Sequence, residues 1–180
     1  MDILTKQILQ SDNVVSLRQT ISLDELKQKF EEIRSFVDGD NIILSVYSMN
    51  IICTEYVFDI ELIIPVDLSK NIPEDYGSIH NFSLNNALKA EHNGSVHTSG
   101  HTVKGMLDYI SDKKLLRASP IYRVCPLDID SEKSTVIYIG VAERIFCYSI
   151  KSFCIFFKVI NFFIFLLFLT ACFIEIQISY

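Results

Sequence analysis

The sequence predicts one α+β domain made of two βαββ units (strand, helix, strand, strand) in tandem, followed by an apolar tail. Two observations support the duplication. The same order of patterns occurs twice, and the closing strands of the two units, residues 58–66 (FDIELIIPV) and 134–141 (STVIYIGV), can be laid over one another. A repeat of this size predicts pseudo-two-fold symmetry between units at about residues 3–66 and 87–141. A third observation sets the boundary, because the composition shifts abruptly to Phe, Ile and Leu after residue 144.

Length, cysteine usage and charge limit the class of protein. The chain has 180 residues, enough for one domain with its own core. Its five cysteines are widely spaced and mostly lie in apolar runs, which is typical of reduced cysteines in a reducing compartment. The net charge of −6 and the scattered basic residues argue against nucleic-acid binding. The first residues, MDILTKQILQSDN, lack the apolar core of a secretory signal, so we expect a cytoplasmic protein.

The first unit begins with a short strand at residues 14–17 and a helix that starts at Ser22. Ser22 and Glu25 have the spacing of a capping box, in which each side chain accepts a hydrogen bond from the other residue's backbone N–H. Apolar residues then recur at spacings of three and four, which places them on one helix face that we expect in the core: Leu23, Leu26, Phe30, Ile33 and Val37. Residues 38–40 (DGD) end this pattern.

Two further strands, at residues 42–49 and 53–66, complete the first unit. In the second of them every even position from Tyr56 to Val66 is apolar, whereas acidic residues occupy odd positions. This period-two alternation predicts one face in the core and the other toward water or a ligand. Residues 67–83 are rich in Pro, Gly, Asn and Ser and predict a connection.

The second unit repeats the order. Residues 87–92 predict a strand and Asn93-Gly94 a turn. Thr98 or Ser99 is the expected N-cap of a helix whose apolar face comprises Val103, Met106, Leu107 and Ile110. Residues 121–125 and 135–141 predict the two remaining strands.

Three histidines surround this second strand-to-helix junction. His97 and His101 are four residues apart and could share a helix face, with His92 as a third ligand. However, no Cys or carboxylate stands at ligand spacing nearby, so we expect no metal site and no cofactor. The histidines are better explained as part of the turn between strand and helix.

The tail, residues 145–180, is predicted to be helical. Its segment 159–174 carries no charge and is just short of the about 17 to 25 residues that a membrane-spanning helix needs. If it inserts, Lys151 and Lys158 before it and Glu175 after it place the domain in the cytoplasm. A helix buried in the domain is disfavoured, because a helix apolar on every face needs a larger core. Two interpretations stay open: a membrane anchor, or an out-of-frame extension read from AT-rich DNA.

Residues 87–124 (ALKAEHNGSVHTSGHTVKGMLDYISDKKLLRASPIYRV) resemble the second half of GyrI-like effector-binding domains. Such domains also occur in Rob-type and BmrR-type bacterial regulators and are related to SOUL heme-binding proteins. The shared features are a His-x-Gly after a strand, an amphipathic helix, and Ser-Pro before the next strand. In the first half, residues 60–66 (IELIIPV) match the family's acid-then-Pro-Val strand. The resemblance covers about residues 3–143, without an invariant motif.

The resemblance implies a curved antiparallel sheet with the helices on one face and a ligand cleft between the halves. By strand alternation, two apolar rows should lie under the helices: Ile60, Leu62, Ile64 and Val66, and Ile137, Ile139 and Val141. The opposite rows would face the cleft and give the predicted ligand-binding residues: Glu61, Ile63, Tyr122, Val136 and Tyr138. Relatives carry a glutamate at the position of Val136 and a tyrosine at that of Cys125, so this chain departs from the pattern at both positions. Glu61 could replace the missing charge.

These features predict a stand-alone, non-catalytic protein that binds a small ligand, expected to be a cationic amphiphile. The loss of the Glu and Tyr pair on which some relatives reported as hydrolases rely argues against an enzyme. The alternative is an interaction protein, similar to gyrase modulators, that docks a protein partner on the same cleft face. Contact with a membrane is expected through the tail alone, and no nucleic-acid partner is expected.

Overall fold

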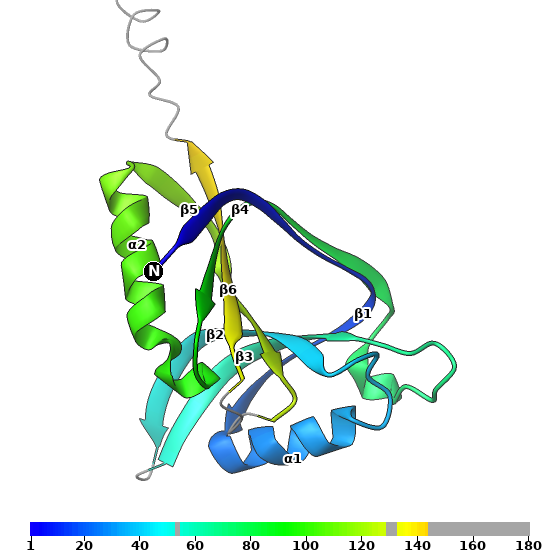
Figure 1. Cartoon of the computed structure of the whole chain (residues 1–180). Coiled ribbons are helices and arrows are strands. Elements are labelled where there is room, and N and C mark those ends of the chain that lie inside the picture. Colours follow the sequence, from blue (N-terminus) through cyan, green and yellow to red (C-terminus); the bar gives the residue numbers. More distant parts are fainter. Residues whose placement is uncertain (53–54, 129–132, 144–180) are drawn as a thin grey trace, which may run out of the picture. The chain divides into compact units, whose positions relative to one another are not determined.

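Strand, helix, strand, strand occurs twice in the computed structural model (Figure 1), which describes residues 1–52, 55–128 and 133–143. The α+β class and the order of elements are as predicted. In chain order the elements are β1 (Ile3–Ser22), α1 (Leu23–Ile33), β2 (Asn41–Ile52), β3 (Glu55–Pro65), the short 3-10 helix η1 (Glu74–Tyr76), β4 (His80–His92), the 3-10 helix η2 (Val96–Ser99), α2 (Gly100–Asp112), β5 (Leu115–Pro126) and β6 (Thr135–Glu143).

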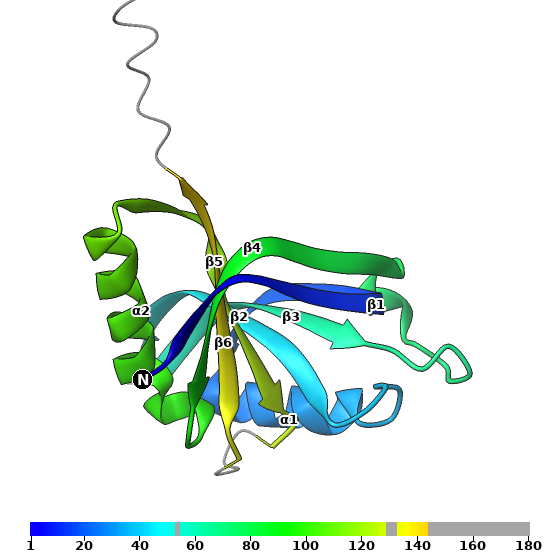
Figure 2. The same cartoon turned by 45° about the horizontal axis from the view of Figure 1, so that its top comes forward.

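The six strands form one curved antiparallel sheet, as predicted, but its closure was not predicted. The strand order is β1-β3-β2-β5-β6-β4, and β4 pairs again with β1. The three strands of the first unit are therefore neighbours, and so are those of the second. The units join at β2 and β5, where Leu44 pairs with Arg123, and again at β1 and β4, where Leu9 pairs with Leu84. Figures 1 and 2 show the long β1 and β4 running side by side away from α2.

The pairing of β1 with β4 rests on two segments whose strand character the alternation did not reveal. Residues 3–13 were given no strand, and residues 80–83 were assigned to a connection. The register between the two strands shifts three times, and Lys6, Asn13 and Asn86 have positive φ angles of 56°, 51° and 53°. Each irregularity breaks the period of two, because an extra residue turns the following side chains to the other face.

Helix α1 begins as predicted. The Ser22 side chain accepts a hydrogen bond from the Glu25 N–H (3.3 Å), and the Glu25 carboxylate accepts one from the Ser22 N–H (2.7 Å). These bonds to Ser22 also lower the pKa of Glu25. The helix ends at Ile33, so the expected continuation to Val37 was wrong. Val37 is nevertheless buried, because it forms an isolated bridge with Val66.

Helix α2 differs from its prediction in two details. Ser99 is the N-cap residue, but its side chain makes no capping hydrogen bond. Ser99 is also the last residue of the preceding η2. Val103, Met106 and Ile110 are buried, as expected, whereas Leu107 is 36% exposed. Leu107 directly follows Met106, so it lies about 100° further around the helix, beyond the buried stripe.

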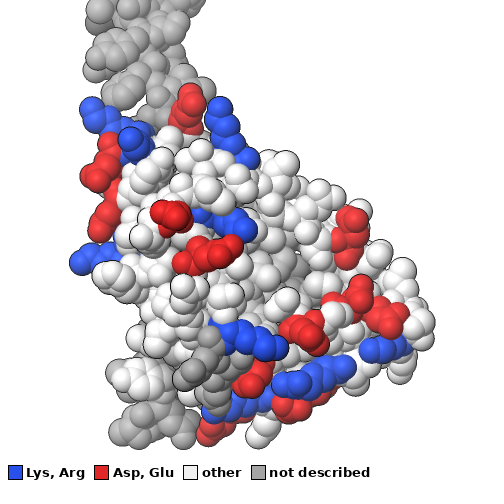
Figure 3. Space-filling model, in the orientation of Figure 1, with Lys and Arg blue, Asp and Glu red and all other residues white. Residues whose placement is uncertain are grey.

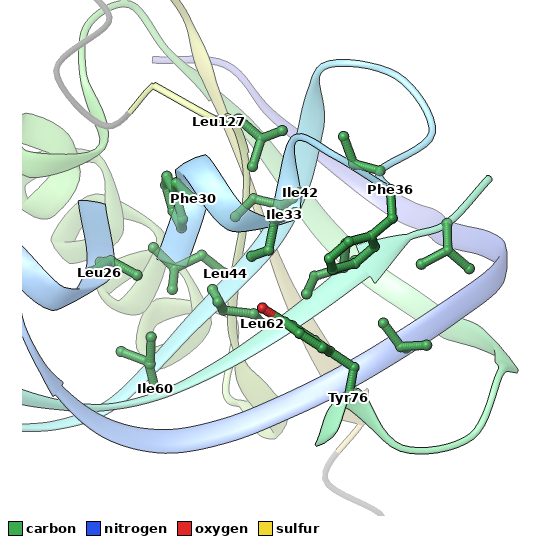
Figure 4. Packing of buried hydrophobic residues seen from close by; sticks show 14 of the residues in the cluster. Leu26, Phe30, Ile33, Phe36, Ile42, Leu44, Ile60, Leu62, Tyr76 and Leu127 are labelled. Carbon is green, nitrogen blue, oxygen red and sulfur yellow. The ribbon is translucent and has the colours of Figure 1, made fainter. Parts of the chain in front are cut away.

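Both helices pack on the same face of the sheet, here called the outer face. Cross-strand pairing places Leu62, Leu44, Arg123 and Ile137 in one row, and paired residues share a face. The predicted apolar rows are confirmed: Ile60, Leu62, Ile64 and Val66 are buried in the cluster of α1, and Ile137, Ile139 and Val141 in that of α2. Figure 4 shows Leu26, Phe30 and Ile33 of α1 in the first cluster with Leu44 and Leu62.

The tail, residues 145–180, lies outside the described residues. The structure therefore tests neither of its two interpretations. Within the ranges that the structure describes, no helix has the length and apolar character needed to cross a membrane.

Candidate ligand-binding site

The five ligand-binding residues predicted from the sequence all lie on the inner face of the sheet, opposite the helices. One cross-strand row contains Arg18, Glu61, Ser45, Tyr122, Tyr138 and Lys89. The adjacent row contains Ser16, Ile63, Ile43, Val124, Val136 and Glu91. The register thus brings Glu61, Ile63, Tyr122, Val136 and Tyr138 onto one surface. Their role in ligand binding stays a prediction.

Side chains from all six strands occupy the space that the sheet encloses. Ile63 and Tyr122 are buried there, and Tyr138 packs against the same cluster. The cluster also receives Leu9 from β1 and Phe82 from β4, and the rings of Phe82 and Tyr122 meet edge to face with centroids 5.2 Å apart. The segments whose strand character was missed in the sequence therefore fill part of the space where a cleft was expected.

Glu61 already has partners on the inner face. Its carboxylate accepts a hydrogen bond from the Tyr47 hydroxyl at 2.6 Å. Burial and this bond raise the pKa of Tyr47 to about 12. The guanidinium of Arg18 lies over the Tyr47 ring, 4.1 Å from its centroid, and its Nη2 is 3.1 Å from Asp59. The Glu61 charge is therefore placed in a hydrogen-bonded network with a cation close by.

A pocket lies on the outer face of the sheet. It measures about 610 Å³ and lies between the start of α1 and the η2–α2 junction, over the middle of the sheet. We call it the outer pocket. Its lining is mostly apolar: Leu23 and Leu26 of α1; Leu44, Val46 and Met49 of β2; Tyr56, Phe58 and Ile60 of β3; Val96, Ser99 and Gly100 of η2 and α2; and Arg123 of β5.

Arg123 is the charged side chain of this lining. Its Nε donates a hydrogen bond to Ser99 Oγ at 3.2 Å, and Ser99 Oγ in turn donates to the Val96 carbonyl at 2.6 Å. Its Nη1 is buried and, among the described residues, has no hydrogen-bond partner. Burial lowers the pKa of this guanidinium, although an arginine remains charged at neutral pH. The outer pocket is therefore lined by a half-buried cation that forms no ion pair with a carboxylate of the described residues.

Arg123 was not among the residues predicted from the sequence, although its pattern contains a signal. Residues 121–125 (IYRVC) alternate between faces, so Ile121, Arg123 and Cys125 share the side that the helices cover. A single charge between two apolar residues on a core-facing row is unusual and marks a candidate functional residue.

His92 is a structural residue of the second strand-to-helix junction. Its two ring nitrogens lie 2.7 Å from Thr98 Oγ1 and 3.0 Å from Thr102 Oγ1. The ring thereby ties the end of β4 to η2 and α2, as the interpretation of the histidines as turn residues implies. His101 is exposed.

Charge is not segregated on the side of the molecule that Figure 3 shows. Lys, Arg, Asp and Glu side chains alternate over α1, without a large field of one sign.

Comparisons with known proteins return structural similarities alone. No protein-family model matches the chain, and no curated protein sequence matches it. The C-terminal domain of EcmrR superposes with a TM-score of 0.48 and 13% identity, over 79% of this chain and 99% of that domain. EcmrR in its DNA complex gives 0.49 and 12% over 78% of this chain, which spans 58% of the EcmrR chain. A hydrolase from Listeria innocua gives 0.42 and 9%, over 78% of this chain and 90% of that protein. Similarities of this size do not assign the chain to a family.

Proposed function

We propose that this domain binds a small, largely apolar molecule in the outer pocket and does so without catalysis. The observation that carries the proposal is the pocket itself. Its volume of about 610 Å³ lies within the range typical of small-molecule sites, and its lining combines many apolar side chains with a few polar groups.

Two apolar side chains of the lining gain most from an occupant. Met49 is 58% exposed and Tyr56 is 55% exposed, and both line the pocket together with Leu26 of α1. Covering apolar surface stabilises a complex by roughly 25 cal/mol per Å². A ligand between them would extend the apolar cluster from Leu26 and Leu44 outward to these residues.

The polar groups of the outer pocket fit binding better than hydrolysis. Ser99 donates its hydroxyl proton to a backbone carbonyl and accepts a hydrogen bond from Arg123. An activated serine instead needs a neighbouring base that removes its proton. We therefore assign Ser99 the task of orienting Arg123.

The inner face is the site of the competing mode, in which Glu61 holds a cationic amphiphile. This carboxylate already accepts a hydrogen bond from the Tyr47 hydroxyl, and the Arg18 guanidinium lies over the Tyr47 ring. If this mode operates, Glu61→Gln weakens the binding of decylammonium and leaves that of decanol unchanged. Docking of a protein partner on the inner face is the other alternative. Recovery of one stoichiometric partner, and its loss when residues of the inner face are substituted, would favour this alternative.

A neutral fluorescent probe tests the proposed pocket. N-phenyl-1-naphthylamine should bind the domain with increased fluorescence and stabilise it against thermal unfolding, because a ligand of the native state shifts the unfolding equilibrium. Gly100 lies on the pocket edge in a helical conformation, and a Cβ built on it has no atom within 4 Å. Gly100→Phe should therefore place a ring at the pocket without a clash and reduce probe binding.

His101→Phe is the matched control, since it adds the same ring at the next, exposed position of α2, outside the pocket lining. It should bind the probe like the natural chain. Absence of probe binding, or equal loss in both variants, would contradict the proposed function.

A further inference from the structure

We infer that the ligand of the outer pocket is an anion, with a carboxylate, sulfonate or phosphate group that Arg123 binds and an apolar body that the lining covers. This inference rests on the proposed function, because it names the chemical class of the molecule that the same pocket takes.

Arg123 lies in a row of otherwise apolar residues on the outer face of the sheet. It pairs with Leu44 of β2 on one side and with Ile137 of β6 on the other. Leu44 belongs to the cluster of α1 and Ile137 to that of α2, so Arg123 stands at the seam between the two clusters. Placing a cation between two apolar clusters costs desolvation free energy. An apolar side chain at this position would connect the two clusters without this cost.

The bonds of Arg123 to described residues do not balance its charge. Its Nε is bound to a neutral hydroxyl, its Nη1 is buried without an acceptor, and among the described residues no carboxylate forms an ion pair with it. No described residue of the pocket lining is acidic. The uncompensated charge would be neutralised by an anionic group in the pocket, and such a group can accept charge-assisted hydrogen bonds from a guanidinium.

The surroundings strengthen such a contact. The apolar residues around Arg123 lower the local dielectric, and a charge-assisted hydrogen bond is stronger there than in water. Gly100 at the pocket edge is the first residue of α2, whose amino end carries a partial positive charge of its own. The domain is acidic overall, with a net charge of −6 for the chain, so preference for an anion would be a local property of this pocket.

A matched pair of probes isolates the charge. N-phenyl-1-naphthylamine is neutral, and 8-anilinonaphthalene-1-sulfonate has the same ring framework with an added sulfonate. The full chain should bind the sulfonate about tenfold or more tightly than the neutral probe, as expected for a charge-assisted hydrogen bond. Arg123→Met should remove this advantage and leave the neutral probe bound as before, while Arg123→Lys should retain part of it.

Arg18→Met is the matched control, because it removes an arginine from the exposed part of the inner face and should leave the affinity ratio unchanged. Equal affinity for both probes in the natural chain, or a sulfonate affinity insensitive to Arg123→Met, would overturn the anion preference while the pocket proposal stands. Failure of both probes to bind would overturn the proposed function instead.

Displacement of the bound sulfonate probe from the natural chain tests the anion preference without a variant that must fold. Decanoate should displace the bound sulfonate probe at a concentration about tenfold lower than decanol does, because the carboxylate takes the place of the sulfonate on Arg123. Displacement by both at the same concentration would overturn the inference.

Discussion

Arg123 has opposite consequences for binding and for stability. Its buried Nη1 has no acceptor among the described residues, and an unsatisfied buried donor costs about 1 to 3 kcal/mol. Its bond to the Ser99 hydroxyl offsets part of this cost. Binding residues commonly lower the stability of the domain that contains them, because a site prepared for a ligand is incomplete without it.

Arg123→Met should therefore raise the free energy of unfolding of the unoccupied domain, by about 1 to 2 kcal/mol. Urea denaturation followed by circular dichroism measures this change. Arg18→Met is the comparison, and it should change the stability little, since it removes an exposed ion pair with Asp59. A clear loss of stability in Arg123→Met would show that the guanidinium is a structural group.

Cys125, two residues further along β5, shows what burial does to a group without a function in the pocket. Burial raises the pKa of its thiol to about 12. The thiolate is the reactive form, so the folded chain at pH 8 should leave Cys125 unmodified by iodoacetamide, whereas unfolding in urea exposes it. Peptide mapping by mass spectrometry identifies the modified site. Rapid modification of Cys125 in the folded chain would contradict its burial.

The same pKa shift has a definite sign in stability. An unfolded thiol titrates near pH 8.5, and the folded one titrates near 12. The folded state thus retains its proton over this window, so the contribution of Cys125 is complete below about pH 8.5 and is lost as the pH rises toward 12. Cys125→Val should reduce this alkaline loss of stability, which urea midpoints at pH 8 and pH 10 compare.

At the scale of the element, α2 offers a test of which residues of an apolar stripe hold a helix to the sheet. Met106 is fully buried, and Leu107 is 36% exposed. Met106→Ala should lower the free energy of unfolding by about 2 to 5 kcal/mol through the cavity it leaves. Leu107→Ala should cost less than about 1 kcal/mol. Equal losses in urea denaturation would mean that Leu107 packs against something beyond the described contacts.

The elements that the sequence predicted best are those in which local signals agree. The capping box of Ser22 and Glu25 and the stripe of Leu26, Phe30 and Ile33 both indicate α1. The even positions of β3 indicate its buried face. In contrast, the irregularities around Lys6, Asn13 and Asn86 hide the outer parts of β1 and β4, because pattern analysis assumes an unbroken period.

At the scale of the whole domain, these hidden segments change the expected site. Pairing of β1 with β4 closes the sheet, and Leu9 and Phe82 then occupy the space beside Tyr122 and Tyr138. The sequence predicted correctly which residues share the inner face. It could not predict that strands from opposite ends of the two units would meet, since such a long-range pairing depends on the entire fold. Arg123 was also not predicted as a site residue. Its position becomes notable only in the fold, where the hydrophobic clusters of α1 and α2 meet at β5.

Residues 145–180 should be dispensable for the folding of the domain. β6 ends at Glu143, each of the six strands has two partners within the described residues, and Met1–Glu143 forms one compact unit. A chain that ends after Arg144 should therefore unfold cooperatively, with the same urea midpoint as the full chain and the same affinity for the neutral probe. A lower midpoint or weaker probe binding would show that residues 145–180 contribute to the domain.

Cell fractionation of the natural chain and of the shortened one then addresses the proposed localisation. If the tail is an anchor, the full chain sediments with membranes and the shortened chain stays in the cytoplasmic fraction, because the shortened chain lacks the uncharged, apolar segment 159–174. If the tail is an out-of-frame extension, the intact mass of the protein from native cells lacks residues 145–180. A full-length chain found entirely in the cytoplasmic fraction would exclude both, and the tail would then require a partner that covers it.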